Sequence, residues 1–226
     1  GTLFPYTTLF RSLGYPKPKP GRSDNLKWYL QQCTDGLTYA VIVGSKQDSE
    51  GNTEIAITIT SNSDTDDPLT QGKKLIKEAL SSGFSKMLKS HKKWWQQFWN
   101  KSAISIPDDN IEQHYYLTQY FYGSASRCGS PAMPLQGLWT ADEGNLPPWK
   151  GDYHHDLNTQ MSYWAYQTAN HIEQGKCFID FLWNLSDKAK EFAKEFYGTS
   201  GLCFPSVMTI DGQPLTGWPQ YSLAPT

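Results

Sequence analysis

The sequence has few charged residues and no excess of either sign. Of its 226 residues, 20 are Lys or Arg and 22 are Asp or Glu, which gives a formal net charge of −2. A protein that binds nucleic acid or an anionic membrane surface through its charge carries a basic excess. The chain also lacks any apolar run near the roughly 20 residues that a membrane-spanning helix needs. Composition therefore predicts neither nucleic acid nor a membrane as a partner.

Cysteine is also sparse. The four cysteines, at positions 33, 128, 177 and 203, show no CxxC or other metal-ligand spacing. No phosphate-binding loop and no Ser/His/Asp signature is present either, so we expect no metal and no cofactor. Cys177 and Cys203 could form a disulfide, or all four cysteines could be buried thiols, and the sequence leaves both possibilities and the cellular compartment open.

Both ends of the chain lack the usual signals of a natural terminus. Residues 1–12, GTLFPYTTLFRS, have no charged segment followed by an apolar core, so they do not read as a signal peptide. They resemble a translated sequencing adapter, although an ordinary edge strand is the alternative. The last residues, GWPQYSLAPT, contain neither a capped helix nor a polar tail. We interpret residues 1–12 as non-native and expect the chain to be a fragment.

Aromatic residues are what the sequence has in abundance. Nine Trp, 13 Tyr and 10 Phe make up 14% of the chain. Most of them are expected in the core, where large rings bury most area. A minority could instead form flat platforms against which sugar rings stack.

The first third of the chain predicts β structure. The Pro-rich residues 13–23 are expected to be irregular. A hairpin signal follows, in which apolar residues alternate before and after an Asp35-Gly36 turn, and a third alternating segment follows it. The residues predicted to share faces are Leu26, Trp28 and Leu30, and then Ile55, Ile57 and Ile59. Because three strands with one apolar face are not stable alone, we expect them to end a larger β-sandwich whose earlier strands lie upstream.

From about residue 70 the apolar period becomes that of a helix. We predict linker helices over about 70–100, divided at Gly83, and a helix over 110–126 that opens with a capping box of Asp109 and Glu112. The later predictions are a buried helix over 158–171, another over 176–198 that stops at Gly198, and a small hairpin on Asp211-Gly212.

The long loop over 127–157 ends in the stretch DYHHDLN, where polar side chains gather. Loops of this length between helices are uncommon unless they build a site. Extended alternation would put His154, Asp156 and Asn158 on one side and His155 and Leu157 on the other. An Asp and an Asn two residues apart can hold one water molecule, as an inverting glycosidase requires.

Plainer roles exist for the same residues. Asn158 or Thr159 could simply cap the helix that follows. His155 could be a structural hydrogen-bond donor, and Asp142 and Glu143 could be solvated loop charges rather than catalytic acids. On residue chemistry alone, these readings stay open beside the hydrolytic one.

Several motifs in this region resemble glycoside hydrolase family 95 and its close relatives. They are Ser124, Ser126 and Arg127 at the end of the first helix, LQGLW at 135–139, PPW at 147–149 and LNTQMSYW at 157–164. The resemblance implies a mostly α protein with a smaller β part: a β-sandwich, a helical linker and an (α/α)6 six-hairpin barrel. The expected divisions are 1–12 as the artefact, 13–69 as the last sandwich strands, 70–107 as the linker and 108–226 as the first, truncated part of the barrel.

The resemblance also assigns roles. In that family two asparagines in the segment matching residues 156–158 hold the catalytic water. Asn158 matches this pattern and Asp156 departs from it, which puts strict fucose specificity in doubt. His154 falls where polar contacts to the sugar are made. The general acid and base have no match here and are expected beyond Thr226.

A set of aromatic residues completes the expected substrate site. We predict that Trp139, Trp149, Tyr153 and Trp164 line one concavity with His154, Asp156 and Asn158, because sugar sites combine convergent polar groups with apolar walls.

The resulting prediction is an inverting exo-hydrolase of α-L-fucosides or related L-sugar glycosides, with an oligosaccharide or glycan as its partner. The alternatives are a phosphorylase, for which Lys150 and Arg127 are the available basic residues, and a non-catalytic carbohydrate-binding homologue. We expect a periplasmic or secreted location for the full-length protein. Its oligomeric state is not predicted.

Overall fold

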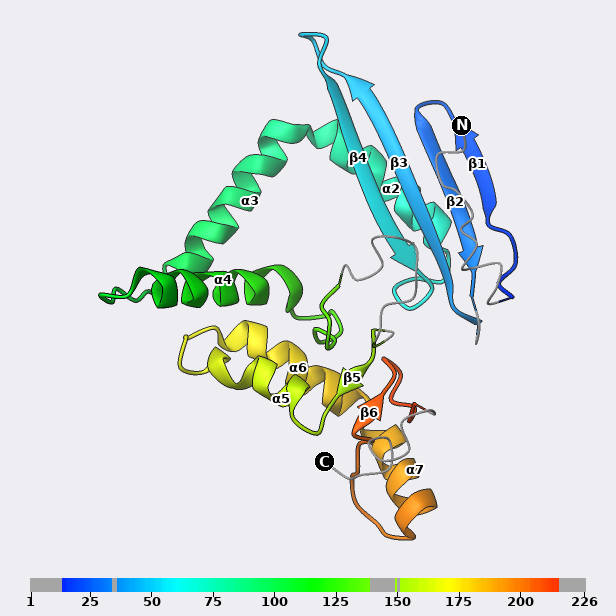
Figure 1. Cartoon of the computed structure of the whole chain (residues 1–226). Helices are drawn as coiled ribbons and strands as arrows, with labels where there is room; N and C mark the ends of the chain where they lie inside the picture. Colours follow the sequence, from blue (N-terminus) through cyan, green and yellow to red (C-terminus); the bar gives the residue numbers. More distant parts are fainter. Residues whose placement is uncertain (1–13, 34–35, 139–148, 150, 216–226) are drawn as a thin grey trace. The chain divides into compact units, whose positions relative to one another are not determined.

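The computed structural model of the chain describes residues 14–33, 36–138, 149 and 151–215 (Figure 1). The chain divides into two compact units, residues 1–94 and 95–226. The interpretation of residues 1–12 as an artefact falls outside the described residues, as does Asp35 of the predicted turn.

The first unit contains a four-stranded antiparallel sheet in the order β1-β2-β3-β4. Its strands are β1 (Lys19–Ser23), β2 (Leu26–Gln32), β3 (Thr38–Gln47) and β4 (Thr53–Ser61). The three strands predicted from alternating apolar residues are confirmed. The prediction of irregular structure over 13–23 is wrong for β1, because an edge strand tolerates a proline such as Pro20.

Helix α2 (Pro68–Ser82) packs on one face of this sheet (Figure 1). It begins after Asp67, whose carboxylate accepts a hydrogen bond from the Thr70 N–H, with Pro68 in the first turn. Its buried Ile76 joins a core cluster with Ile42 of β3. The helix ends at Gly83, with φ of 79°, and α3 (Phe84–Trp99) follows. The predicted division at Gly83 is confirmed.

The other face of the sheet carries a row of exposed isoleucines. Ile55, Ile57 and Ile59 of β4 have relative exposures of 65%, 66% and 58%. Ile57 pairs with Val43 and Ile59 with Val41, so apolar side chains of two strands lie on this face. The expectation that the three isoleucines share one face is confirmed.

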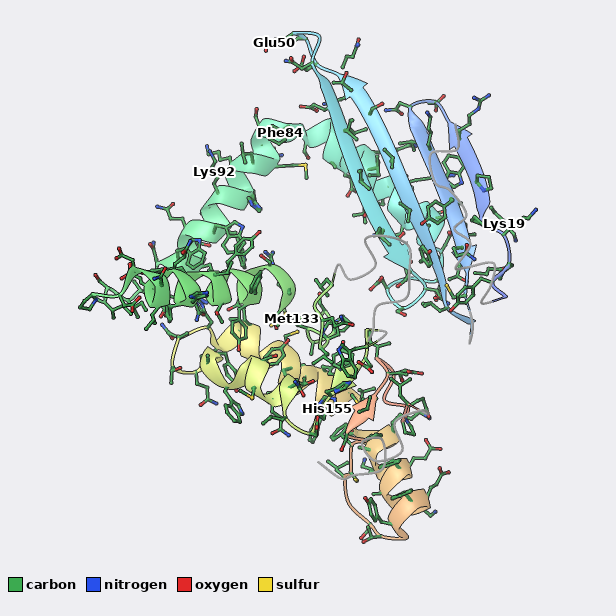
Figure 2. All side chains as sticks on the ribbon, viewed as in Figure 1. Lys19, Glu50, Phe84, Lys92, Met133 and His155 are labelled. Atoms are coloured by element: carbon green, nitrogen blue, oxygen red, sulfur yellow. The ribbon has the colours of Figure 1, made fainter. Side chains whose placement is uncertain are left out.

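The second unit is mostly helical. Its elements are α4 (Asp109–Ala125), β5 (Tyr153–His154), α5 (Asn158–Tyr163), η2 (Trp164–Tyr166), α6 (Ile172–Asn184), α7 (Ser186–Tyr197) and β6 (Val207–Met208). The buried members of its core include Tyr122, Tyr153, Tyr163, Phe181 and Met208. Figure 2 labels His155 just after β5, among densely packed side chains of this unit.

Several predicted helix boundaries are corrected. Asp108, not Asp109, caps α4, because its carboxylate accepts from the N–H groups of Asn110 and Ile111, and Glu112 reaches back to the Ile106 N–H instead. The helix expected over 158–171 is only α5 with the 3-10 turn η2, since the chain turns after residue 166. The helix expected over 176–198 is two helices with a break at Leu185, although its end at Gly198 is confirmed by a left-handed φ of 65°.

Near the C-terminal end of the described chain, the predicted hairpin on Asp211-Gly212 forms in part. Met208 bridges Pro214, and the Thr209 N–H donates to the Gln213 carbonyl.

The cysteines are all free thiols. Cys177 and Cys203 therefore do not pair, and of the four only Cys177 is buried. Of the two possibilities that the sequence left open, neither a Cys177–Cys203 disulfide nor four buried thiols is found. Across the described residues no helix has the length and apolar character to cross a membrane.

Candidate functional site

The polar stretch lies where β5 joins α5. β5 pairs with β6 through Tyr153 opposite Met208 and His154 opposite Val207. The His155 N–H donates to the Ser206 carbonyl at 2.6 Å. The chain then turns over residues 155–157, and α5 begins at Asn158. The predicted extended alternation from 154 to 158 is therefore wrong, because the strand ends at His154.

Buried hydrogen bonds hold α5 in place. The Ser126 hydroxyl lies 2.9 Å from the Tyr163 hydroxyl and donates to the Gln174 carbonyl at 2.8 Å. The Met133 N–H donates to the same Tyr163 hydroxyl at 2.8 Å, and the Tyr122 hydroxyl donates to the Ser162 carbonyl. Ser126, one of the motif residues, thus fixes the helix that carries Asn158.

Asp156 and Asn158 are both exposed at this junction. The N-cap of α5 is Leu157, with no side-chain cap hydrogen bond. Capping roles for Asn158 and Thr159 are therefore wrong, and Thr159 is buried in the first turn. Among the described residues, the hydrogen bond recorded for Asn158 beyond the helix's own backbone bonds is at its main-chain carbonyl, to which the Ser162 hydroxyl donates at 3.0 Å. The carboxamide of Asn158 is thus not needed to begin the helix.

His154 faces an acidic partner and an aromatic ring. Its Nε2 lies 3.3 Å from Oδ1 of Asp152. Its ring meets Trp149 edge to face, with centroids 5.3 Å apart. Asp152 is almost fully buried, and such a carboxylate is stable only with compensating charges or donors. His154, Asp152 and Trp149 therefore form one packed group beside the turn.

Two neighbours of His154 belong to the core. Tyr153 is buried, and its hydroxyl donates to the Ala132 carbonyl at 2.7 Å. Burial raises its pKa. His155 is also buried, with its ring stacked parallel to Tyr153. Burial lowers the pKa of His155 to about 4, against a smaller opposing effect of Asp156. Within the described chain, its Nε2 has no hydrogen-bond partner, so this nitrogen is not a structural donor there.

A cavity of about 300 Å3 lies nearby, lined in part by Arg127, Pro131, Leu138, Tyr153 and Ile210. Among the predicted site residues that the structure describes, Tyr153 alone lines it. Trp164 is exposed on η2. Trp139, Asp142 and Glu143 lie outside the described residues. The predicted single concavity with Asp156 and Asn158 is thus not this cavity.

Asp152 is the residue that sequence reasoning missed. The signal was present, because in an extended stretch residues two apart lie on the same side. If the extended alternation is continued toward the N-terminus from His154, Asp152 falls on the same side as His154. Among the residues that the structure describes, no group of three or more His, Cys, Asp or Glu side chains is arranged to hold a metal ion.

The catalytic domain of glycosyl hydrolase family 95 matches residues 81–226, more than half of the chain. The chain belongs to glycoside hydrolase family 95. The matched range contains the polar stretch at the junction of β5 and α5 and the Ser126 network that supports it. The family assignment expected from the motifs is confirmed.

Family 95 relatives are named as fucosidases. "Probable alpha-fucosidase A" of Aspergillus niger is 30% identical over 149 residues, which cover 54% of this chain and 18% of that protein. "Alpha-L-fucosidase 2" of Arabidopsis thaliana is 33% identical over 91 residues, covering 40% of this chain and 11% of the relative. "Probable alpha-fucosidase A" of Aspergillus oryzae is 24% identical over 234 residues, which cover 92% of this chain and 31% of that protein. The chain thus spans less than a third of the length of these relatives.

Proposed function

We propose that this chain is part of an inverting exo-hydrolase that releases L-fucose or a related L-sugar from α-linked glycans. The family and the fucosidase names of its relatives support the reaction class. The observation that carries the proposal is the exposed pair of Asp156 and Asn158 at the junction of β5 and α5. Their side-chain oxygens are available to a ligand, because α5 is capped without them.

The proposed chemistry is the delivery of one water molecule to the anomeric carbon. Inverting glycosidases place a water between a general base and the sugar face opposite the leaving group. In this proposal Asn158 and Asp156 position that water, and His154, Trp149, Trp164, Tyr153 and Trp139 contribute to sugar binding. The general acid and base lie beyond Thr226. The proposed architecture is a β-sandwich that ends with β4, linker helices α2 and α3, and an (α/α)6 barrel that begins with α4.

The test uses a protein that contains this chain and the rest of the catalytic domain. Asn158→Ala should reduce turnover of an α-L-fucoside by about 10²–10³, the usual cost of removing one preorganised polar group. The melting temperature should hardly change, because the side chain caps nothing. Asn110→Ala, at an exposed position early in α4, is the matched control and should leave both quantities unchanged. Full turnover in Asn158→Ala would refute the water-positioning role.

Asp156→Asn tests the sugar specificity. This change restores the asparagine pair of the family, so fucoside turnover should hold or rise if the sugar is fucose. Loss of all activity would mean that the Asp156 carboxylate acts as a charge, in base catalysis or in binding another sugar.

The anomer of the first product, followed by NMR, checks inversion. Phosphate-dependent release of a sugar phosphate would favour a phosphorylase, and glycan binding without turnover a binding homologue.

A further inference from the structure

Two cysteines lie where the segment after α4 packs against α6. Sγ of Cys128 is 3.5 Å from the main-chain carbonyl oxygen of Glu173, in the first turn of α6. Sγ of Cys177 is 3.1 Å from the carbonyl oxygen of Ser130 and 3.6 Å from that of Pro131. Each thiol therefore contacts the segment that carries the other one.

The contacts of the two thiols are close together on α6. The helical hydrogen bond joins residues four apart, so the Glu173 carbonyl that Cys128 touches is also the acceptor for the Cys177 N–H. Burial raises the pKa of the Cys177 thiol, Ser126 and Arg127 lower it by less, and the neighbouring Cys128 thiol raises it further. The two sulfur atoms thus face the same small region from opposite segments, as free thiols.

The two thiols differ in their access to solvent. Cys128 is exposed, whereas Cys177 has 1% relative exposure. A dissolved oxidant reaches Cys128 directly and reaches Cys177 only through Cys128. An exposed thiol with a second thiol beside it is the arrangement in which thiol–disulfide exchange ends in an intramolecular disulfide.

We propose that Cys128 and Cys177 form a disulfide in an oxidising compartment, and that this bond fastens the segment after α4 to α6. The periplasmic or secreted location expected for the full-length protein is of this kind. The bond lies beside the contact in which the Ser126 hydroxyl donates to the Gln174 carbonyl at 2.8 Å. It closes the loop from residue 128 to residue 177, which contains the junction of β5 and α5.

The oxidant is a small disulfide such as oxidised glutathione. The Cys128 thiolate attacks one sulfur of this disulfide and releases one glutathione thiol, which leaves a mixed disulfide on Cys128. The Cys177 thiolate then attacks the Cys128 sulfur and releases the second glutathione thiol. The two cysteines together lose two protons and two electrons, and the two glutathione thiols carry them away.

Peptide mapping of the 226-residue chain tests the pairing. The reduced chain is incubated with oxidised glutathione at pH 8, its remaining thiols are alkylated, and it is digested with trypsin without reduction. Trypsin cuts after the Lys and Arg residues on either side, so Cys128 and Cys177 fall in the separate peptides 128–150 and 177–188. We expect mass spectrometry to find these two peptides joined to each other.

Three variants separate a paired thiol from a lone reactive one. In Cys177→Ser, Cys128 should stop at the mixed disulfide with glutathione. In Cys128→Ser, Cys177 should stay reduced because it is buried. Cys203→Ser removes a half-buried thiol outside the pair, so this control should form the disulfide as the wild type does.

The melting temperature tests the fastening role. The oxidised wild type should melt roughly 5–15 °C above the reduced form, because a cross-link that closes a long loop restricts the unfolded chain. The same treatment should leave the melting temperature of Cys177→Ser unchanged. An oxidised wild type that melts no higher than the reduced form would refute this role.

A wild-type map without the joined peptides would overturn the pairing itself. So would the same mixture of disulfides in buffer and in concentrated urea, since urea removes the native contacts and should allow several pairings. If a variant does not fold, the two wild-type maps alone decide. The maps do not depend on turnover, so they stand apart from the test of the proposed function.

Discussion

Ser126 shows how much one small side chain can organise. It is fully buried between the end of α4 and the two helices α5 and α6. Its hydroxyl lies within hydrogen-bond distance of the Tyr163 hydroxyl and donates to the Gln174 carbonyl. The Tyr163 hydroxyl in turn accepts a hydrogen bond from the Met133 N–H. The serine of the motif therefore helps to hold α5, the helix that begins at Asn158.

Ser126→Ala should destabilise the fold by about 1–3 kcal/mol, because it leaves buried polar partners without a hydrogen bond. Ser124→Ala makes the same change at an exposed position two residues earlier and should stay within about 0.5 kcal/mol of wild type. Urea denaturation of the two variants measures the difference. Equal stabilities would show that the Ser126 hydroxyl is replaced by water or is not needed.

The sequence predicts where polar residues gather, but not which of them are buried. Residue types and spacing located the polar junction before Asn158. They could not show that Tyr153 and His155 are buried while Asp156 is exposed, because that depends on where the strand stops. The pairing of β5 with β6, some 50 residues later in the chain, decides this point.

At the scale of elements, two helices contain glycines that permit close packing. A Cβ at Gly175 of α6 would lie 2.1 Å from Cγ of Tyr166, an atom near the base of a rigid ring. A Cβ at Gly72 of α2 would meet Cδ1 of Ile42 at 2.2 Å, the far end of a flexible side chain. The same Gly→Ala change therefore meets a rigid ring at Gly175 and a flexible side chain at Gly72.

Gly175→Ala should therefore cost about 1–3 kcal/mol through overpacking, despite the roughly 1 kcal/mol by which alanine favours a helix over glycine. Gly72→Ala should cost less, because the Ile42 side chain can rotate. Thermal unfolding of both variants gives the comparison. A Gly175→Ala protein as stable as wild type would mean that the η2 turn moves aside without loss.

Element types were easier to predict than element ends. The period-two pattern found β2, β3 and β4, and the helical period found α2, α3 and α4. β1 escaped because its prolines mimic a loop. The break between α6 and α7 at Leu185 escaped because the apolar period continues across it. A change of helix direction is set by what the two helices pack against, and the local pattern does not contain that information.

At the scale of the whole chain, the buried histidines lie in one unit. His155 and His171 are both buried in the second unit, whereas His91 of the first unit is exposed. Burial lowers the pKa of His155 to about 4. Burial, with a smaller effect of Lys101, also lowers the pKa of His171, which stacks on Phe98 with centroids 3.9 Å apart. The two units should therefore respond differently to mild acid.

The direction follows from proton linkage. An unfolded histidine titrates near 6.5, so below that pH the unfolded second unit binds protons that the folded unit does not. Its stability is fully present above pH 6.5 and decreases as the pH falls toward 4. His155 alone should remove about 1.3 kcal/mol between pH 7.5 and 5.5. Nearly all of this loss falls below pH 6.5, where a pH unit is worth at most about 1.4 kcal/mol for one proton.

Hydrogen exchange of the intact chain, read by mass spectrometry on peptides of each unit, measures this effect. Between pH 7.5 and 5.5, after correction for the intrinsic exchange rate, protection should decrease in peptides from 95–215 and hold in peptides from 14–94. His155→Phe keeps an aromatic ring against Tyr153 and removes the titrating group, so it should reduce the loss in the second unit. His114→Gln, at an exposed position on α4, should leave the loss unchanged. An equal loss of protection in both units would show that the acid response comes from groups other than the buried histidines.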